Sequence, residues 1–406
     1  MILRKIKQIL FAIITVFFSL VVIDLALHAA ASVVPQVNDL ISTVSVKVPD
    51  AKLLYRPNPA YPDHDEKGFR NAQVPAAADI VALGDSHTWG SGVKSEQTWP
   101  KALEVLTGRP VYNMGMSGWG PVQSFLYWEE ATSLKPKVVI EGLYSGNDLY
   151  DAFSMVYLRG QLPELMSGDK TMQDKIKQEK QVESIQSRVS KMFGSGNKKS
   201  GLRLSVKAWL ARNSAVYGLL TRAQFELSRL HEAQTGPPTA DEEWQKALSR
   251  AARYPENSQV FSSDSSRTVF TSEYRLAALN LEDPRIREGQ RIALEVIRQM
   301  HQLAIREGIR FIVLLLPTKE LAFSEQTKAL AYSNYQSLLR NEQQFWAETK
   351  SFFAQHSIEY IDALPPLQAN LQEGSQPYNV SYDGHPNAVG HRVIAEAVRS
   401  YLDRGN

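Results

Sequence analysis

The chain contains no cysteine among its 406 residues, and its formal net charge is only +2. Without cysteine there can be no disulfide framework, no thiol nucleophile, no thiolate metal site and no lipid anchor on cysteine. A nearly balanced charge gives no reason to expect nucleic acid as a partner. The sequence also lacks internal repeats and low-complexity tracts. A chain of this length can bury a large core, in one domain or two.

The first 34 residues have the composition of a targeting segment. Three basic residues precede an uncharged apolar run over residues 9–23, and the apolar character resumes after Asp24. Basic residues before such a run keep the N-terminus in the cytoplasm and send the following chain across the membrane. The segment is long enough for an uncut anchor if Asp24 and His28 lie in the outer interface. We therefore expect a single-pass inner-membrane protein with a periplasmic domain; cleavage near residues 29–31, giving a secreted protein, is the alternative.

Residues 35–77 are a polar connector rich in proline, aspartate and asparagine. Within it, Asp63-His64-Asp65 has the composition of a metal site. Three adjacent loop residues rarely converge on one ion, so we predict a solvated turn here. We expect no metal and no cofactor.

From residue 78 onward, short apolar runs alternate with amphipathic stretches. The runs predict five strands, at residues 80–83, 110–113, 137–143, 311–316 and 358–361. The amphipathic stretches predict helices, at residues 99–106, 122–134, 287–306, 335–356 and 388–402. Strands that alternate with helices indicate an α/β domain with a doubly wound parallel sheet.

The alternation lapses over residues 151–285, which are mostly polar and helical in tendency. Residues 208–230 carry apolar side chains at helical spacing, whereas residues 169–191 are typical of a solvated helix or flexible arm. We predict a long helical insertion that is placed to form a lid over the strand ends. A segment of this length is either functional or partly disordered, and the sequence leaves both open.

Four stretches rich in small polar residues follow predicted strands or open the last helix. They are Gly84-Asp85-Ser86, residues 113–118, Gly146-Asn147-Asp148 and Asp383-Gly384-His385-Pro386. The carboxyl ends of parallel strands meet at one edge of a sheet, so all four are expected there. Ester cleavage by serine needs a nucleophile, a base, a carboxylate that orients the base, and donors for the oxyanion. The four stretches contain each of these groups.

Ser86 is the predicted nucleophile, His385 the general base, and Asp383 the acid that orients the imidazole. The predicted oxyanion donors are the backbone N–H groups of Ser86 and Gly118 and the side-chain amide of Asn147. Simpler explanations exist: a helix cap for Ser86, a positive-φ turn for Gly118 and a turn-forming residue for Asn147.

The aromatic and imidazole side chains near these stretches are not assigned to the catalytic steps. His87 is expected at the rim, because a base adjacent in sequence would point away from Ser86. Trp89, Trp119 and Tyr144 suit either a pocket wall or the core.

In these four blocks the chain resembles the SGNH/GDSL hydrolases, a family named for its serine, glycine, asparagine and histidine. Here these residues are Ser86, Gly118, Asn147 and His385. The resemblance implies a three-layer α/β/α fold with a flavodoxin-like, five-stranded parallel sheet, and lipolytic, esterase or transferase activity without a metal.

The resemblance covers residues 78–150 and 287–403, and it places the hydrolase domain at residues 78–406 with the insertion inside it. The Gly-x-Ser-x-Gly motif of the α/β-hydrolases is not present. One feature departs from the family. The acid usually lies three residues before the histidine, where this chain has Tyr382, and Asp383 lies two before. Either the loop adjusts so that Asp383 still reaches the ring, or a Ser–His dyad works with a backbone acceptor.

The resemblance implies a serine esterase that removes O-acyl groups, above all O-acetyl, from an envelope or secreted glycan through an acyl-enzyme. In an O-acyltransferase a sugar hydroxyl would resolve the same intermediate. A degenerate domain that binds glycans, or serves a polysaccharide-assembly machinery, is a further alternative. A lipase or thioesterase predicts an apolar lid, which the polar insertion disfavours. The expected partners are an acylated glycan or small ester and, through the N-terminal helix, the membrane.

Overall fold

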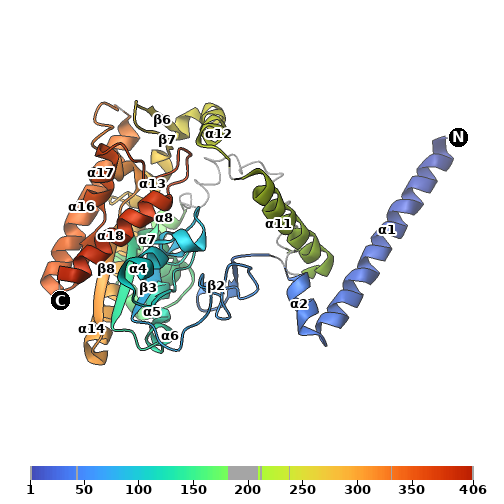
Figure 1. The fold of residues 1–406 in the computed structure, drawn as a ribbon, viewed down its shortest axis with the longest axis horizontal. Helices are drawn as coiled ribbons and strands as arrows, with labels where there is room; N and C mark the ends of the chain where they lie inside the picture. Colours follow the sequence, from blue (N-terminus) through green and yellow to red (C-terminus); the bar gives the residue numbers. More distant parts are fainter. Residues whose placement is uncertain are drawn as a thin grey trace. The chain divides into compact units, whose positions relative to one another are not determined.

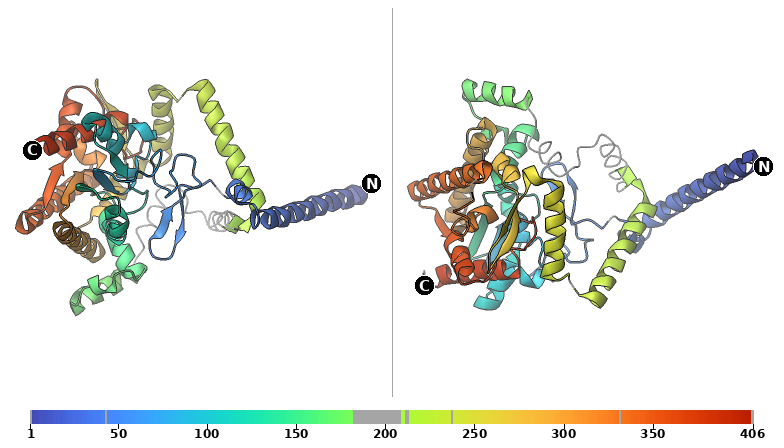
Figure 2. Two further views of the ribbon diagram at one scale, coloured as in Figure 1. Left: turned by 60° about the horizontal axis from the view of Figure 1, so that its bottom comes forward. Right: turned by 90° about the horizontal axis from the view of Figure 1, so that it is seen from above.

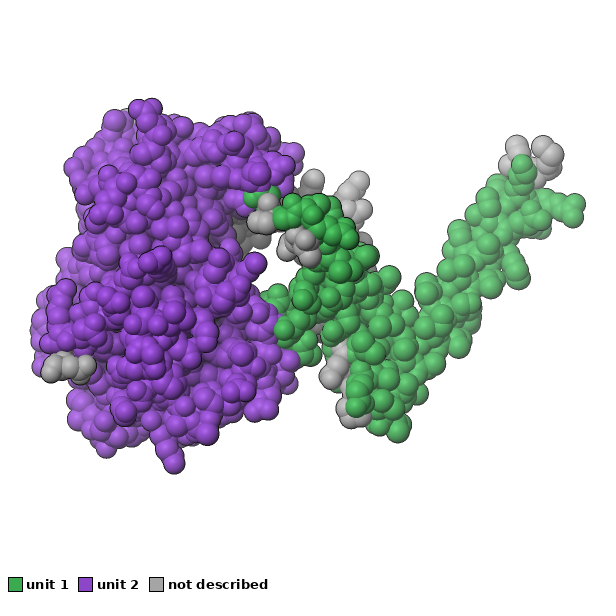
Figure 3. Space-filling model, in the orientation of Figure 1, with its two compact units in different colours: residues 1–46, 60–62, 194–238 green, residues 47–59, 63–193, 239–406 purple. Residues whose placement is uncertain are grey.

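The computed structural model describes residues 2–42, 44–181, 209–210, 213–236, 238–330 and 332–404. The chain forms two compact units, coloured green and purple in Figure 3. The first unit contains residues 1–46, 60–62 and 194–238, and the second contains residues 47–59, 63–193 and 239–406. The connector predicted over residues 35–77 is therefore divided between the two units.

The described part of the first unit is helical. Helix α1 (Ile2–Ala31) exposes its apolar side chains, and its residues 4–31 are long and apolar enough to cross a membrane or to serve as a signal sequence. Helix α2 (Pro35–Ile41) contacts both α1 and α11 (Ala215–Thr235). The Asp24 carboxylate accepts hydrogen bonds from the Ser214 hydroxyl (2.8 Å) and the Val216 backbone N–H (3.0 Å). Asp24 thus fixes the start of α11 against α1.

Five parallel strands form the central sheet of the second unit, so the predicted α/β fold class is confirmed. The strands are β3 (Ile80–Gly84), β4 (Val111–Asn113), β5 (Val138–Tyr144), β8 (Arg310–Leu316) and β9 (Glu359–Asp362). Their order is β4-β3-β5-β8-β9. The strand order reverses at β3, and such a switch point opens a crevice at the carboxyl ends of the strands.

Helices cover both faces of this sheet (Figure 1 and Figure 2). Helix α4 (Trp99–Thr107) packs against α18 (Ala388–Arg404), whereas α14 (Pro284–Glu307) packs against both α5 (Pro121–Leu126) and α16 (Ser333–His356). Right-handed crossovers place the helices on two faces of the sheet, because the chain moves from β3 to β4 in one direction across the sheet and from β4 onward in the other. Burial on both faces explains why β3, β5 and β8 are almost entirely apolar.

Shorter elements complete the second unit. Strands β1 (Lys47–Asp50) and β2 (Leu54–Pro57) form one antiparallel hairpin, and β6 (Gln259–Ser262) and β7 (Arg267–Phe270) form another. Among the described residues of this unit, the remaining helices are α3 (Ser86–Trp89), α6 (Trp128–Thr132), α7 (Asp148–Phe153), α8 (Lys170–Gln181), α12 (Ala240–Arg253), α13 (Ser272–Leu279), α15 (Lys319–Ala322) and α17 (Leu364–Gln372). Short turns of other helix types cover Ser95–Gln97, Ser154–Leu158, Pro163–Leu165 and Pro255–Asn257.

The segment predicted as a helical insertion, residues 151–285, is helical only in part. The β6–β7 hairpin lies within it, because Val260, Phe261 and Val269 belong to alternating, β-branched and aromatic sequences. The arm predicted over residues 169–191 is helical as far as Gln181. Residues 182–208 lie outside the described residues.

The turn predicted to be solvated at residues 63–65 is instead well packed. Asp65 is buried and accepts hydrogen bonds from the Tyr112 hydroxyl (2.8 Å) and the Phe69 backbone N–H (3.1 Å). Arg70 donates to the Gly90 carbonyl at 2.6 Å. The prediction failed because Tyr112 and Gly90, which contact Asp65 and Arg70, are distant from this turn in the sequence. Residues 63–71 therefore support the loop that follows α3.

The buried carboxyl of Glu141 in β5 generates a stability prediction. Burial, and to a smaller extent the charge of Asp85, raises the pKa of Glu141 to about 8 against the opposing Ser124 hydroxyl. Between about pH 4.5 and pH 8 the folded chain therefore holds a proton that the unfolded chain has lost, so stability falls as pH rises. Glu141→Gln should remove this fall, which linkage puts at up to about 5 kcal/mol.

Urea unfolding of the wild type and Glu141→Gln at pH 5 and pH 8.5 measures the effect. Glu129→Gln, which changes an exposed carboxyl, is the matched control and should keep the wild-type pH dependence. An unchanged pH dependence in Glu141→Gln would contradict the assignment.

Candidate active site

Ser86 begins α3 directly after β3, at the edge where the strand order reverses. Gly84 has a φ of +138°, and a Cβ there would lie 2.5 Å from the Thr88 hydroxyl, so the turn requires glycine. The Asp85 carboxylate accepts a hydrogen bond from the His87 backbone N–H at 2.8 Å and caps the helix. The sharp turn and the cap together present the Ser86 hydroxyl at the carboxyl end of the strand.

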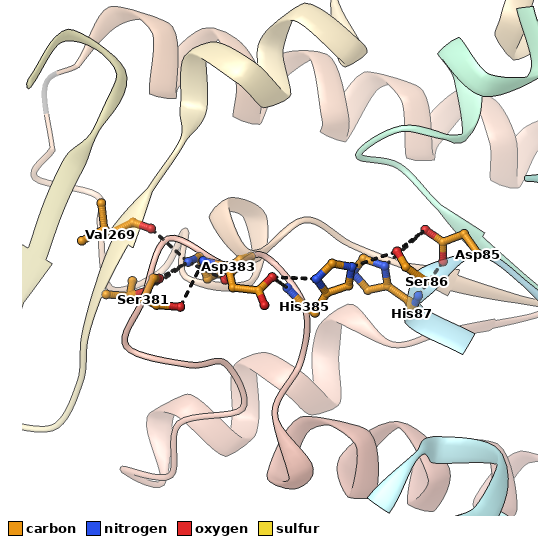
Figure 4. A network of polar contacts seen from close by, with 9 residues as sticks. Asp85, Ser86, His87, Val269, Ser381, Asp383 and His385 are labelled. Atoms are coloured by element: carbon orange, nitrogen blue, oxygen red, sulfur yellow. Dashed lines mark hydrogen bonds and ion pairs between the residues drawn. The ribbon is translucent and has the colours of Figure 1, made fainter. Parts of the chain in front are cut away.

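Two hydrogen bonds join Ser86, His385 and Asp383 in a line (Figure 4). The His385 Nε2 atom lies 2.8 Å from Ser86 Oγ, and His385 Nδ1 lies 2.6 Å from Asp383 Oδ1. When Nδ1 carries the ring proton and donates a hydrogen bond to the Asp383 carboxylate, Nε2 is unprotonated and can accept the proton of the Ser86 hydroxyl. The structure thus brings together the three residues that the sequence predicts as nucleophile, base and acid.

The unusual spacing of Asp383 and His385 has a local explanation. Asp383 Oδ1 also accepts a hydrogen bond from the His385 backbone N–H, at 3.1 Å. An aspartate that bonds the backbone two residues later forms a tight turn, and this turn carries the ring back to the same oxygen. A separation of two residues therefore suffices for the acid to reach Nδ1.

The charge of Asp383 is favoured by its partner. Burial opposes ionisation, but the hydrogen bond and charge of His385 outweigh it and lower the pKa of Asp383 to about 2. The carboxylate is consequently ionised at neutral pH. A negative charge at Nδ1 stabilises the imidazolium that forms when Nε2 takes a proton.

A second acid–imidazole pair lies beside the serine. Asp85 Oδ2 is 3.3 Å from both Ser86 Oγ and His87 Nδ1. His87 is buried and stacks on the Tyr144 ring with 3.7 Å between centroids, so its expected place at the rim is wrong. Burial lowers the pKa of His87. Burial also opposes the charge of Asp85, but His87 outweighs it, and the pKa of Asp85 lies below its ordinary value.

Gly118 and Asn147 follow β4 and β5, the two strands that flank β3. Gly118 has a φ of +82°, and the Asn147 amide donates to Asp151 Oδ2 at 2.6 Å. The Lys47 ammonium donates to the carbonyl of Ser117 at 3.2 Å, and its charge acts on Asp151. Gly118 and Asn147 therefore lie at the same sheet edge as Ser86. Their use as oxyanion donors remains a prediction.

Arg275, a buried residue of α13, was not predicted as a neighbour of the site. Its guanidinium packs against Gly384, which leaves no room there for a Cβ, and lies 5.4 Å from the centre of the Tyr144 ring. No motif points to Arg275, since α13 is distant in sequence from the four blocks. Among the described residues, no group of three or more His, Asp or Glu side chains is placed to hold a metal ion.

The Tyr144 hydroxyl yields a prediction. It is buried, and the described residues offer it no hydrogen-bond partner. Tyr144→Phe should therefore raise the free energy of unfolding by about 1 kcal/mol, because it removes an unsatisfied polar group and keeps the ring on His87. Tyr112→Phe is the matched control and should lose about 1 kcal/mol, since that hydroxyl donates to Asp65. Thermal unfolding measures both, and a destabilised Tyr144→Phe would contradict the prediction.

Several solved structures are similar to this chain over most of its length. A member of the lipolytic protein G-D-S-L family from Veillonella parvula is 11% identical, with a TM-score of 0.34, and the match covers 80% of this chain and 98% of that one. A GDSL-like lipase from Bacteroides thetaiotaomicron is 10% identical, with a TM-score of 0.32 and coverage of 80% and 88%. A catalytic mutant of an acetylxylan esterase from Geobacillus stearothermophilus is 11% identical, with a TM-score of 0.35 and coverage of 81% and 95%.

No protein-family model matches the chain, and no curated protein sequence does. The three solved structures named above are two GDSL lipolytic proteins and an acetylxylan esterase.

Proposed function

We propose that this chain is a serine esterase of the SGNH/GDSL type that removes O-acyl groups, above all O-acetyl, from a glycan. The observation that carries the proposal is the line of hydrogen bonds from Asp383 through His385 to Ser86, at 2.6 and 2.8 Å. These distances are those of a nucleophile paired with a base and a base paired with its orienting acid. Intact geometry of this kind favours an enzyme over a degenerate binding domain.

The proposed reaction has two halves. Ser86 Oγ attacks the ester carbonyl while its proton passes to His385 Nε2, and the imidazolium then protonates the departing sugar oxygen. Water next gives a proton to Nε2 and attacks the acyl-enzyme, and the acid leaves as Ser86 recovers its proton. Gly118 and Asn147 join the Ser86 N–H as donors to the oxyanion. An O-acyltransferase would differ only in that a sugar hydroxyl replaces the water.

A cleft beside the acid supports a saccharide substrate. It has a volume of about 410 Å³ and is bounded by α12, α13 and residues 381–384. Arg250 stacks on the Tyr382 ring at 3.7 Å, and Lys246 and Tyr274 line the same cleft. An aromatic ring packs on the apolar face of a sugar, while Arg, Lys and Tyr groups bond its hydroxyls.

The N-terminal helix supports an envelope location. Helix α1 is apolar and exposed over the length of a membrane span, and basic residues precede its apolar part. By the positive-inside rule, these basic residues favour a cytoplasmic N-terminus and a periplasmic esterase domain. A glycan of the cell envelope, or one being secreted through it, is within reach of such a domain.

Covalent labelling of the full chain in detergent tests the proposed nucleophile. A fluorophosphonate should label the wild type but not Ser86→Ala, and the matched control Ser95→Ala should label normally. On p-nitrophenyl acetate, Ser86→Ala and His385→Ala should lower kcat/KM by at least about 10³-fold, and Asp383→Ala by about 10²–10⁴-fold. Labelling of Ser86→Ala at the wild-type rate, or a folded wild type that does not react, would refute the proposal.

Substrate selectivity tests the saccharide cleft. Arg250→Ala should raise KM at least about fivefold for O-acetylated oligosaccharides and leave KM for p-nitrophenyl acetate unchanged, because only the larger substrate reaches the cleft. Arg253→Ala, an exposed residue at the end of the same helix, is the matched control. Equal changes on both substrates would contradict a role in sugar binding. Faster turnover with an added oligosaccharide acceptor would favour the transferase.

A further inference from the structure

Lys319 is a buried cation that the triad chemistry does not use. It begins α15, with two residues between it and the end of β8, and is only 1% exposed. Its ammonium donates to four oxygens: the Thr268 hydroxyl at 3.1 Å, and the carbonyls of Val269, Ser381 and Asp383, each at 2.9 Å. Figure 4 labels the last three of these acceptor residues. Lysine is almost never buried this deeply unless its charge is solvated by the protein. Here carbonyl and hydroxyl oxygens replace the water.

The four acceptors belong to two segments that are far apart in the sequence. Thr268 and Val269 come from β7, and Ser381 and Asp383 come from the loop that ends at His385. The Thr268 hydroxyl reinforces this contact, because it lies 3.2 Å from the Ser381 carbonyl. The ammonium therefore holds the backbone of the acid-bearing loop against β7 and the end of β8.

The charges around Lys319 are consistent with a bound ammonium. Burial lowers its pKa to about 8, while Glu320 and Asp383 favour the charged form and Arg275 opposes it. The Lys319 amine is therefore protonated in most molecules at neutral pH, and its three N–H groups are shared among the four acceptor oxygens.

We propose that Lys319 is a positioning residue for the triad: by holding the carbonyls of Ser381 and Asp383, it sets the Asp383 carboxylate against His385 Nδ1. This inference rests on the proposed esterase function. It accounts for how an acid only two residues before the histidine keeps its place, since the turn between them is anchored from behind. The ammonium contacts neither the serine nor the imidazole and acts only through Asp383.

A double-mutant cycle in the full chain separates positioning from general stability. Lys319→Met keeps the length of the side chain and removes its donors. On p-nitrophenyl acetate it should lower kcat about 10- to 100-fold with KM within about twofold, and slow fluorophosphonate labelling by the same factor. In the Asp383→Ala background it should change kcat by less than about twofold, because no carboxylate remains to be positioned.

Multiplicative losses in the cycle, or wild-type kcat in a folded Lys319→Met, would overturn the inference. Lys328→Met, which changes an exposed lysine, is the matched control and should behave as wild type. If Lys319→Met does not fold, Thr268→Val decides. It removes one acceptor and should lower kcat about three- to tenfold, again only when Asp383 is present. Activity retained in Ser86→Ala would instead mean that the proposed function itself is wrong.

Discussion

The hydrogen bond between Asp383 and His385 is the contact on which the site depends. It places the proton on Nδ1, orients the ring and leaves Nε2 facing Ser86. The turn formed by the same aspartate determines the direction of the ring, and Lys319 holds that turn from the other side. Ser86, the predicted nucleophile, needs less support from distant residues, because the glycine turn and the helix cap after β3 already fix its position.

Much of the fold was predictable from the sequence, because a parallel sheet covered on both faces leaves a simple pattern. The central strands β3, β5 and β8 are largely apolar runs, and the candidate triad lies at the carboxyl ends of the strands or before the last helix. The buried residues that hold the site in place show no such pattern in the sequence. Asp65 and Lys319 are of residue types that are usually exposed to solvent, and only partners distant in the sequence explain why they are buried.

The segment between β5 and β8 supplies residues that surround the candidate site at the carboxyl edge of the sheet. Its β7 strand supplies two of the acceptors of Lys319, its α13 places Arg275 against Gly384, and its α12 forms one wall of the cleft. The same inserted residues thus support the acid and shape the surface that a substrate would meet. A common scaffold acquires specificity in this way, since its strands stay constant while the connections vary.

Peptide mapping after fluorophosphonate treatment tests the central claim most directly, since it identifies the atom that reacts. The account predicts one phosphonyl group per chain, carried by the peptide that contains Ser86, and formed far more slowly in Asp383→Ala because the imidazole has lost its acid. An adduct on another serine, or an equal rate of labelling in Asp383→Ala, would contradict it.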